Sequence, residues 1–580
     1  MTEKPRTDRQ GPNRLARFIP LLQWAPQYQR QWLRADLIAG LTVTALVVPK
    51  ALGYAGIARV PIQCGLYAAA AGAILYAIFG TSRQISTGPS SALAAVAASA
   101  VLVAGVSGDE DTVALVAAIT LVTGVLFLLL ALFKMGWISQ FLSKAVITGF
   151  LFGAAIEVVI GELPKITGTS IEGSSAWQKL FSWFQSLPET DGTTLLVGII
   201  SLVLILGLRF VAPRVPGALV LVVAGLVASA AFGLGDRGLS MVGDVPRGLP
   251  SLALPDLGFV LDNLPVILPA AVGLLLIGFS QSAGDARAFA AKHKYQVDID
   301  QESVAQGISN VGSGLVQGIP VSTSLSASSL NDTSGAKTPV ASLITGALII
   351  LTLLILAPLF SGLPKAVLAG LIIDAVVFGM MDVPEMRRLF RVARVDFWIA
   401  IAAILGVLTS GVLAGVMIGI ALSILWLIYI SVTPHMQELG RKPGTQVFRG
   451  VDDHPGHETY PGLLVLRFDA GLFFASADAL VDRLIELYHQ ADPKLHTIVL
   501  DFEGVNFIDS QGADTLDGIL ELATGRDIEL RLTRLKTDVK EVLQRDGFID
   551  RLGEDHIYGN VYEAAADKMP EAASPQAISD

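Results

Sequence analysis

LIAGLTVTALVVPKALGYAG, residues 37–56, is an apolar run that contains Lys50 directly after Pro49. A helix needs roughly 20 mostly apolar residues to cross a bilayer, and this run has that length. An ionisable side chain inside such a helix is costly, and it usually has a functional role. The stretch therefore predicts a membrane helix that carries a working charge.

Similar apolar stretches continue to about residue 433, and 52% of the chain is hydrophobic while only 16% is charged. Helices satisfy their own backbone groups in lipid, so these stretches are predicted to be membrane helices. We expect spans near 37–55, 64–80, 112–133, 142–161, 193–211, 216–234, 264–286, 339–358, 364–381, 395–411 and 413–433. Three further segments, 88–105, 300–316 and 322–333, are shorter or more polar.

The positive charges of the loops predict the orientation. With a cytoplasmic N-terminus, the inner loops hold Arg83, Lys134, Lys144, Arg209, Arg214, Arg287, Lys292, Lys294, Lys337, Arg387, Arg388, Arg391 and Arg394. The outer loops hold the smaller set Arg59, Lys165, Lys179, Arg237, Arg247 and Lys365. Since Lys and Arg favour the cytoplasmic side, we expect a multi-pass protein of the cell's inner (plasma) membrane. Both the N-terminus and the C-terminal domain would be cytoplasmic.

Several function classes are disfavoured. Residues 1–35 are basic and polar without an apolar core, so we expect no cleavable signal peptide. Cys64 is the one cysteine, and no histidine lies in an apolar span, which argues against a metal site, a cofactor or a histidine base in the membrane. No Walker motif indicates ATP hydrolysis, and no basic stripe indicates nucleic-acid binding. We therefore expect a protein that is not an enzyme.

The pattern becomes that of a soluble α/β domain near Pro461. Strands are expected within 462–475, 496–505 and 528–535, and amphipathic helices within 477–491 and 512–525. The predicted organisation is a cytoplasmic segment 1–35, a transmembrane domain 36–433, a linker 434–460, a soluble domain 461–570 and a disordered tail 571–580.

Two polar interruptions lie within the apolar region. TGPSSALAA (87–95) predicts a helix start, with a cap and then a proline in the first turn. GIPVSTSLSASSLNDTSGAKT (318–338) predicts a broken helix beside a polar cavity. A helix N-terminus at membrane depth suits an anion, because its N–H groups are free and its dipole end is positive. An ordinary interfacial cap and a surface loop are the alternatives.

Two acidic residues are further candidates. Asp285 lies four residues after Gln281, so the two share one face of a helix. Asp285 could instead pair with Arg287 or meet solvent near the cytoplasmic end of its span. Glu157 is a weaker candidate of the same kind.

Taken together, these motifs resemble the sulfate permease (SulP) family, bacterial relatives of the solute carrier twenty-six anion transporters. The resemblance rests on WAPQYQRQWLRADLIAGLTVTALVVPKALGYAGIARVPIQCGLYAA (24–69), GTSRQISTGPSSAL (80–93), ARAFAAKHKYQVDIDQE (286–302), GISNVGSGLVQGIPVSTSLSASSLN (307–331) and SGAKT (334–338). In the C-terminal domain, VLDFEGVNFIDSQGADTL (499–516) resembles the core strand and loop of a STAS domain.

The resemblance implies an α-helical polytopic fold with 14 membrane segments in two inverted seven-segment repeats, plus a C-terminal α/β STAS domain. A core domain would move against a gate domain, usually in a homodimer surrounded by membrane lipids. The anion would bind between two half-helices, with the first and eighth helices closing the site. The implied contacts are Lys50, Gly88, Pro89, Ser90, Ser91, Ala92, Gln281, Ser324, Leu325 and Ser326.

The chain departs from the family pattern at the site. Lys50 replaces a frequent glutamine, Ala327 a frequent arginine, and Gln281 a frequent acid. Our hypothesis is that a positive charge has moved to the first helix, while Asp285 supplies the acid one turn later. Asp285 would then bind the coupling proton or sodium ion, or neutralise Lys50.

The STAS resemblance also offers a regulatory residue. Asp509, Ser510, Gln511 and Gly512 fit a loop in which the serine is phosphorylated in some relatives. The preferred interpretation is a turn in which Asp509 caps the next helix.

The function that follows is secondary active transport of a small inorganic or carboxylate anion, coupled to protons or sodium, by alternating access. Sulfate is the default substrate, and bicarbonate and C4-dicarboxylates such as fumarate are alternatives within the family. An anion channel, and an anion sensor that signals through the STAS domain, are competing classes.

Overall fold

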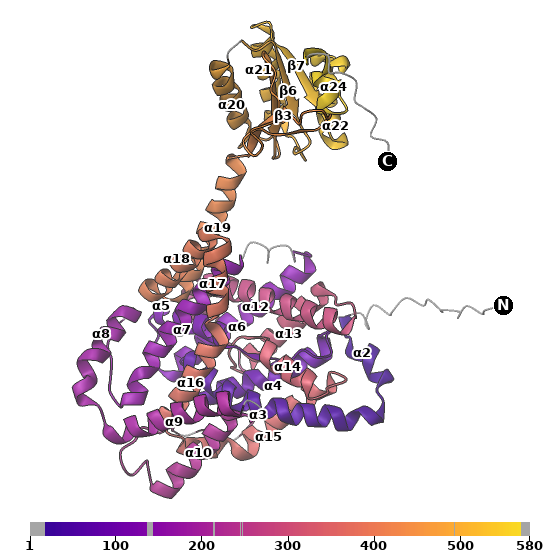
Figure 1. Ribbon diagram of the computed structural model, residues 1–580. Helices are drawn as coiled ribbons and strands as arrows, with labels where there is room; N and C mark the ends of the chain where they lie inside the picture. The colour runs from indigo at the N-terminus through magenta and orange to yellow at the C-terminus, as the bar shows by residue number, and fades with distance from the viewer. Residues whose placement is uncertain are drawn as a thin grey trace, which may run out of the picture. The chain divides into compact units, whose positions relative to one another are not determined.

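The computed structural model describes residues 18–135, 143–173, 175–212, 215–243, 245, 248–491 and 494–569. The chain forms two compact units, Met1–Ser423 and Ile424–Asp580 (Figure 1). The tail predicted at 571–580, and the basic residues predicted before residue 18, lie outside the described residues.

The first unit is almost entirely helical. Its elements are α2 (Leu21–Trp24), α3 (Leu33–Ile57), α4 (Ile62–Phe79), β1 (Thr87–Pro89), α5 (Ser91–Ala104), α6 (Asp109–Leu132), α7 (Lys144–Thr167), α8 (Ala176–Ser186), α9 (Gly192–Val211), α10 (Gly217–Phe232), α11 (Leu257–Asp262), α12 (Leu264–His293), α13 (Ile299–Leu315), β2 (Val321–Thr323), α14 (Leu325–Thr333), α15 (Val340–Leu351), α16 (Lys365–Met380), α17 (Val383–Val392) and α18 (Arg394–Ser410). Helix α19 (Val412–Val432) leads from this unit into the next.

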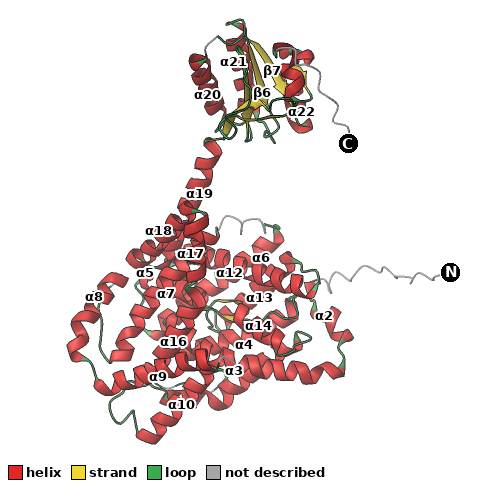
Figure 2. Cartoon of the chain, viewed as in Figure 1, coloured by secondary structure: helices red, strands yellow, loops and turns green. Residues whose placement is uncertain are grey.

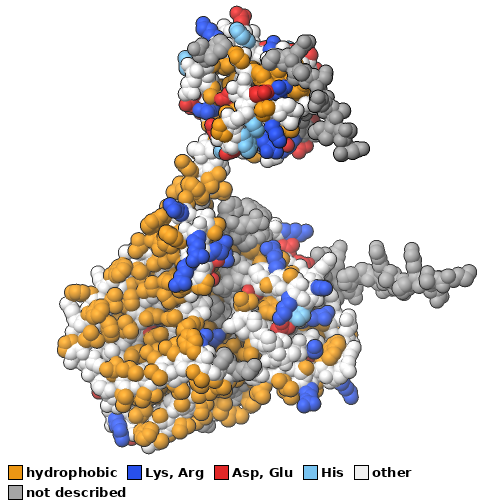
Figure 3. All heavy atoms as spheres, viewed as in Figure 1, with side chains coloured by type: hydrophobic (Ala, Val, Ile, Leu, Met, Phe, Trp, Pro, Cys, Tyr) orange, Lys and Arg blue, Asp and Glu red, His pale blue; other side chains and the backbone are white. Residues whose placement is uncertain are grey.

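Every predicted membrane segment coincides with a helix or with a short strand followed by a helix. Among the described residues, nine helices are long and apolar enough to cross a membrane, and α5 and α10 are shorter apolar helices. The fourteen crossings and the inverted repeats remain predictions. Figure 3 shows hydrophobic side chains spread widely over the visible face of this unit. Exposed side chains such as Val203 and Val211 of α9 suit a lipid environment.

Glycine lets the helices approach closely at two places. A β-carbon built on Gly65 of α4 would lie 2.0 Å from the carbonyl oxygen of Ala51 in α3. Gly124 of α6 and Gly307 of α13 face each other in the same way, each with a β-carbon position about 3 Å from the other's carbonyl oxygen. Small residues at such contacts let helices pack without a hydrophobic driving force.

Several short helices were not predicted from the sequence, and two of them lie beside the long helices of the first unit. Helices α8 and α17 are short and amphipathic, so their polar residues resemble loops in a scan for long apolar runs. Lys179 was assigned to an outer loop, but it lies in α8 with its side chain buried.

The second unit contains one six-stranded sheet in the order β4-β3-β5-β6-β7-β8. The strands are β3 (Met436–Arg441), β4 (Phe448–Gly450), β5 (Leu463–Phe468), β6 (Thr497–Asp501), β7 (Glu529–Thr533) and β8 (Ile557–Tyr558). The helices are α20 (Ala477–Gln490), α21 (Ser510–Thr524), α22 (Thr537–Asp546), α23 (Phe548–Leu552) and α24 (Val561–Ala565). Strands β5 to β8 are parallel, and β3 pairs antiparallel with both β4 and β5.

The segment 434–460, predicted as a linker, therefore carries two strands of this sheet. Strand β3 pairs with β5 from Met436 to Glu438, so the folded domain begins well before Pro461. The strand signal was missed because β3 is short and contains Gln437, Glu438 and Arg441.

One ion pair fixes the last helices of the domain to the sheet. Arg531 of β7 is buried and contacts Asp567 after α24, with 2.8 Å between Nη2 and Oδ2. This hydrogen-bonded pairing holds the pKa of the Asp567 carboxyl well below its usual range. The interaction is therefore kept through neutral pH and is lost only in strong acid, when the carboxylate is protonated.

The close approach at Gly65 gives a test of the helix packing. In Gly65→Ala the new methyl would meet a backbone carbonyl that cannot turn away, so we expect a loss of upwards of about 3 kcal/mol. The apparent melting temperature of the purified protein in detergent should fall by several degrees. The control is Gly207→Ala, where a β-carbon would meet no atom within 4 Å. That variant should melt at or slightly above the wild-type temperature, and a Gly65→Ala protein of equal stability would contradict the packing.

Candidate functional site

Two three-residue strands lie inside the helical unit and pair with each other. Thr87 is opposite Thr323, Gly88 opposite Ser322, and Pro89 opposite Val321. Figure 2 shows this small strand pair among the helices. The pairing is antiparallel, so the helices that follow the two strands leave from opposite ends of the pair. Their N-termini are thereby fixed around one short piece of extended backbone.

Each of these helices begins with a serine cap. Ser90 Oγ accepts a hydrogen bond from the Leu93 N–H at 3.4 Å, and Ser324 Oγ accepts one from the Ala327 N–H at 3.4 Å. The prediction that Pro89 lies in the first turn of a helix is wrong. Pro89 ends β1 and Ser91 is the first residue of α5, because Thr87–Pro89 pairs with β2 instead of winding into the helix.

Buried polar side chains hold the strand pair in place. Asn310 of α13 accepts from the Val321 N–H at 3.0 Å and donates to the Val321 carbonyl at 2.9 Å. Ser328 Oγ accepts from the Ser86 N–H at 2.9 Å. Asn310 and Ser328 are fully buried. Buried backbone groups need such partners, so these contacts replace the ladder that a wider sheet would provide.

The structure brings Lys50 to the start of α14. Lys50 Nζ donates to Ser326 Oγ at 3.1 Å, and the hydroxyls of Ser324 and Ser326 are 3.3 Å apart. Ser326 and Leu325 are exposed at this position, whereas Ala92 of α5 is buried. The predicted grouping of Lys50 with Ser324 and Ser326 is thus present in the geometry. An ammonium, two hydroxyls and a helix N-terminus form a set of donors suited to an anion.

Helix α12 contacts the strand pair from another side. Thr323 Oγ1 donates to Asp285 Oδ2 at 2.7 Å, and Ser322 Oγ donates to Gln281 Oε1 at 3.2 Å. Asp285 is therefore bonded to β2, and the alternative pairing with Arg287 is not the one formed. Gln281 and Asp285, the two residues predicted on this helix, each accept one hydrogen bond from a side chain of β2.

An ion pair near Lys50 was missed from the sequence. Asp374 of α16 is buried and binds Arg209 of α9 through two hydrogen bonds, Nε–Oδ1 at 2.7 Å and Nη2–Oδ2 at 2.6 Å. Arg209 was counted among the inner-loop charges, although the predicted span 193–211 contains it, and it lies in the last turn of α9. A lone acid in the apolar run 364–381 was the signal that could have found Asp374.

Glu157 belongs to a separate charged cavity. Its carboxylate lies 3.4 Å from Lys179 of α8, and a cavity of about 880 Å³ is also lined by Arg59, Glu162 and Lys165. Glu157 is therefore a member of an ion cluster and is not isolated in an apolar span. Among the described residues, no group of three His, Cys, Asp or Glu side chains could hold a metal ion.

In the C-terminal domain, Asp509 caps α21 as predicted. Asp509 Oδ1 accepts from the Gly512 N–H at 2.8 Å, and Oδ2 accepts from the Phe474 N–H at 3.1 Å. Ser510 is the exposed first residue of the helix. A phosphate on Ser510 would meet the positive end of α21, so its regulatory role stays a prediction.

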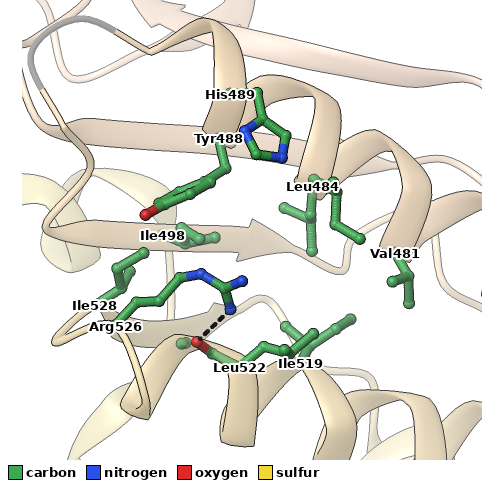
Figure 4. Close-up of a pocket in the computed structure, with 11 residues that line it drawn as sticks. Val481, Leu484, Tyr488, His489, Ile498, Ile519, Leu522, Arg526 and Ile528 are labelled. Carbon is green, nitrogen blue, oxygen red and sulfur yellow. Dashed lines mark hydrogen bonds between the residues drawn. The ribbon is translucent and has the colours of Figure 1, made fainter.

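The same domain has an apolar groove of about 590 Å³ between α20 and α21 (Figure 4). Leu484 and Ile519 line it, and the guanidinium carbon of Arg526 lies 5.3 Å from the ring centre of Tyr488. Its lining is mostly hydrocarbon. The groove therefore lacks the set of hydrogen-bond donors found at the start of α14.

Comparison with known proteins agrees with this division into two parts. Residues 33–403 match the model of the sulfate permease family, and residues 454–564 match the STAS domain. A probable sulfate transporter of Mycobacterium tuberculosis strain CDC 1551 / Oshkosh is 36% identical over 542 residues, which cover 92% of this chain and 96% of that protein. The chloroplastic sulfate transporter 4.1 of Arabidopsis thaliana is 30% identical over 94% of this chain and 82% of its own length.

Solved structures share the fold. The murine solute carrier 26 member A9 anion transporter, in its inward-facing state, has a TM-score of 0.86 with 21% identity, covering 98% of this chain and 96% of that chain. The transmembrane domain of the cyanobacterial bicarbonate transporter BicA has a TM-score of 0.58 with 24% identity, covering 68% of this chain and 98% of that chain.

The clamp on Val321 gives a test of how the site is positioned. Asn310→Ala would leave the buried N–H and C=O of Val321 without partners, at about 1–3 kcal/mol each, so β2 should shift and anion affinity should fall at least tenfold. The matched control is Ser309→Ala, because Ser309 is also fully buried and its hydroxyl has no hydrogen-bond partner among the described residues. Titration of both purified variants with sulfate measures the effect. Full affinity in Asn310→Ala would show that the clamp does not position the site.

Proposed function

The chain belongs to the sulfate permease family, and we propose that it is a secondary active transporter that moves a small anion across the membrane by alternating access. Family membership supports an anion transporter. The observation that carries the proposal is the meeting of Lys50 with the N-terminus of α14 at Ser326, beside the strand pair that also holds α5.

The local charges suit a small anion. Each helix N-terminus contributes the equivalent of about half a positive charge, and Lys50 contributes a full one. The sum is about two positive charges, before Asp285 is counted. Such a site offsets the cost of removing a dianion from water, which is the main barrier to placing it in a membrane protein.

Sulfate is the substrate that we propose first. The relatives from Mycobacterium tuberculosis and Arabidopsis thaliana described above are named as sulfate transporters, and the charge sum matches a dianion. A C4-dicarboxylate carries the same charge and is the nearest alternative. Bicarbonate carries half that charge, and the name of the structural neighbour BicA makes it the third substrate to test.

We propose Asp285 as the coupling group. An ionised Asp285 bonded to Thr323 would reduce the positive charge available to a dianion. Protonation or sodium binding at Asp285 restores that charge, so anion and cation would bind together. This linkage is what symport requires.

The protein is further proposed to act as a homodimer in the inner membrane, with its N-terminus and STAS domain in the cytoplasm. Ser510 would be its regulatory site. The predicted division into core and gate domains gives alternating access a structural basis.

A channel and a sensor are the competing functions, and measuring the flux of the anion into liposomes distinguishes both from a transporter. The protein, reconstituted in liposomes, is tested for uptake of labelled sulfate, fumarate and bicarbonate under imposed proton and sodium gradients. A transporter shows saturable uptake that a gradient drives uphill. Binding without flux would indicate a sensor, and flux that follows only the anion's own electrochemical gradient would indicate a channel. Either result would reject the proposed function.

Lys50→Gln tests the anion site. The variant removes a charged hydrogen-bond donor, which is worth about 1.5–3 kcal/mol, so the affinity for the anion should fall about tenfold or more. Lys337→Gln is the control, because Lys337 is an exposed loop lysine whose loss removes the same charge from the chain. Calorimetric titration with sulfate measures both. Unchanged affinity in Lys50→Gln would exclude Lys50 from the site.

Asp285→Asn tests the coupling. If Asp285 carries the coupling proton, the variant should take up sulfate at a rate that no longer depends on pH, since its amide does not titrate. Asp262→Asn is the control, because Asp262 is an exposed acid at the end of α11. Uptake is measured in proteoliposomes from about pH 5 to about pH 8, the range in which proteins tend to be most stable. A pH dependence retained in Asp285→Asn would reject the proton role.

A further inference from the structure

The Arg209–Asp374 ion pair joins α9 to α16, and α16 packs against α3, the helix that carries Lys50. Helix α16 contacts both α3 and α9, and Figure 1 shows the three helices in the same part of the unit. Lys50 lies one turn before Gly53 on α3. A β-carbon built on Gly53 would be 3.3 Å from Ile372 and 3.8 Å from Leu371 of α16. Leu371 in turn lies one turn before Asp374.

The direction of packing puts Asp374 at the level of Lys50. Gly56, further along α3, is opposite Ile372 and Leu368, so the two helices run antiparallel. Moving back along α3 from Gly53 to Lys50 therefore corresponds to moving forward along α16 from Leu371 toward Asp374. One more turn along α16, a β-carbon built on Gly379 would lie 3.9 Å from the hydroxyl of Ser91. Helix α16 thus passes the site over the whole distance from Lys50 to the start of α5.

Asp374, the acidic member of the pair, is the one on the helix that packs against α3. The packing places Asp374, on α16, at the level of Lys50, whereas Arg209 belongs to α9, which packs against α16. Arg209 keeps the carboxylate in a fixed place, since both of its oxygens are bonded and the guanidinium also lies 4.2 Å from the centre of the Phe378 ring. A two-point contact to arginine orients a carboxylate more strictly than a single bond would.

Lys50 is not bonded directly to a carboxylate of any described residue. Its one hydrogen bond goes to the neutral hydroxyl of Ser326, and none of the described carboxylates forms a salt bridge with its ammonium. An ammonium has three donors, and a charge that is left uncompensated away from water is costly. Without a bound anion, Asp374 is the group that compensates Lys50. A bound anion beside Ser324 and Ser326 would take over that role and would also be repelled by Asp374.

We propose that Asp374, held by Arg209, is a positioning residue that neutralises Lys50 while the site is empty and competes with the anion for it. This inference rests on the proposed transport function and extends it to the return step of the cycle. An empty site with an uncompensated Lys50 moves through the membrane slowly, whereas a site neutralised by Asp374 moves readily. Net uptake needs that return step, and anion exchange does not.

The test uses two variants of the full chain. Asp374→Asn removes the competing charge but leaves Arg209 unpaired, so the double variant R209Q/D374N is made beside it and leaves no orphaned charge. Both should bind sulfate at least fivefold more tightly than the wild type. In both, the ratio of net uptake to sulfate–sulfate exchange should fall at least fivefold. A merely structural role would lower both rates together and would not change their ratio.

The matched control removes another ion pair of the same unit, Glu385 and Arg388 of α17, which are 2.7 Å apart. E385Q/R388Q should keep the wild-type affinity and the wild-type ratio. Variants that elute as folded protein with unchanged affinity and ratio would overturn the inference, as would a double variant that loses exchange. Wild-type protein that shows neither exchange nor uptake of any anion would instead reject the proposed function.

Discussion

One antiparallel pair of three-residue strands determines where the functional groups of the membrane unit lie. An anion can be held in a bilayer only if fixed donors replace its water, and helix N-termini are such donors when something other than lipid anchors them. Here Thr87–Pro89 and Val321–Thr323 anchor each other, and α5 and α14 start at their ends. Asn310, Gln281 and Asp285 all bond to the second strand. The site is therefore assembled around backbone pairing, and its charged side chains are attached to it.

The sequence predicts the helices well because each one is a local pattern. Apolar runs of the right length, serine caps and the cap at Asp509 depend on residues within one or two turns of each other. The strand pair is different, since Thr87 and Thr323 are far apart in the chain and three residues carry no alternating pattern. The Pro89 prediction failed for this reason. The local sequence, a proline followed by serines, favours a helix start, but Pro89 instead lies in a strand that pairs with the distant residue Val321. Strands β3 and β4 of the C-terminal sheet were missed because these short strands are too polar to stand out.

The pairing of charged side chains is also difficult to predict from the sequence. Lys50 was recognisable as a single charge inside an apolar helix, and so, in principle, was Asp374. Which charges meet could not be predicted, because the meeting of Arg209 and Asp374 depends on the packing of α9 against α16. Arg209 was mistaken for a loop residue because it lies within three residues of a helix end. A charge so close to the end of a helix can be counted with the loop that follows, so the partner of a buried acid was counted as a positive-inside signal.

The contact between α3 and α16 combines two properties that a moving site needs. Gly53 and Gly56 give α3 a face without side chains, against which Ile372 of α16 packs closely. A helix face without side chains would not by itself favour any particular position of α16 along α3. In the proposed cycle, Lys50 and Asp374 would supply the preference, because their attraction depends on the register of the two helices and weakens once an anion neutralises Lys50. A ligand shifts a conformational equilibrium only by the difference between its free energies of binding to the two states. In this protein that difference can be produced at one helix–helix contact, where the anion and a fixed carboxylate compete for the same ammonium.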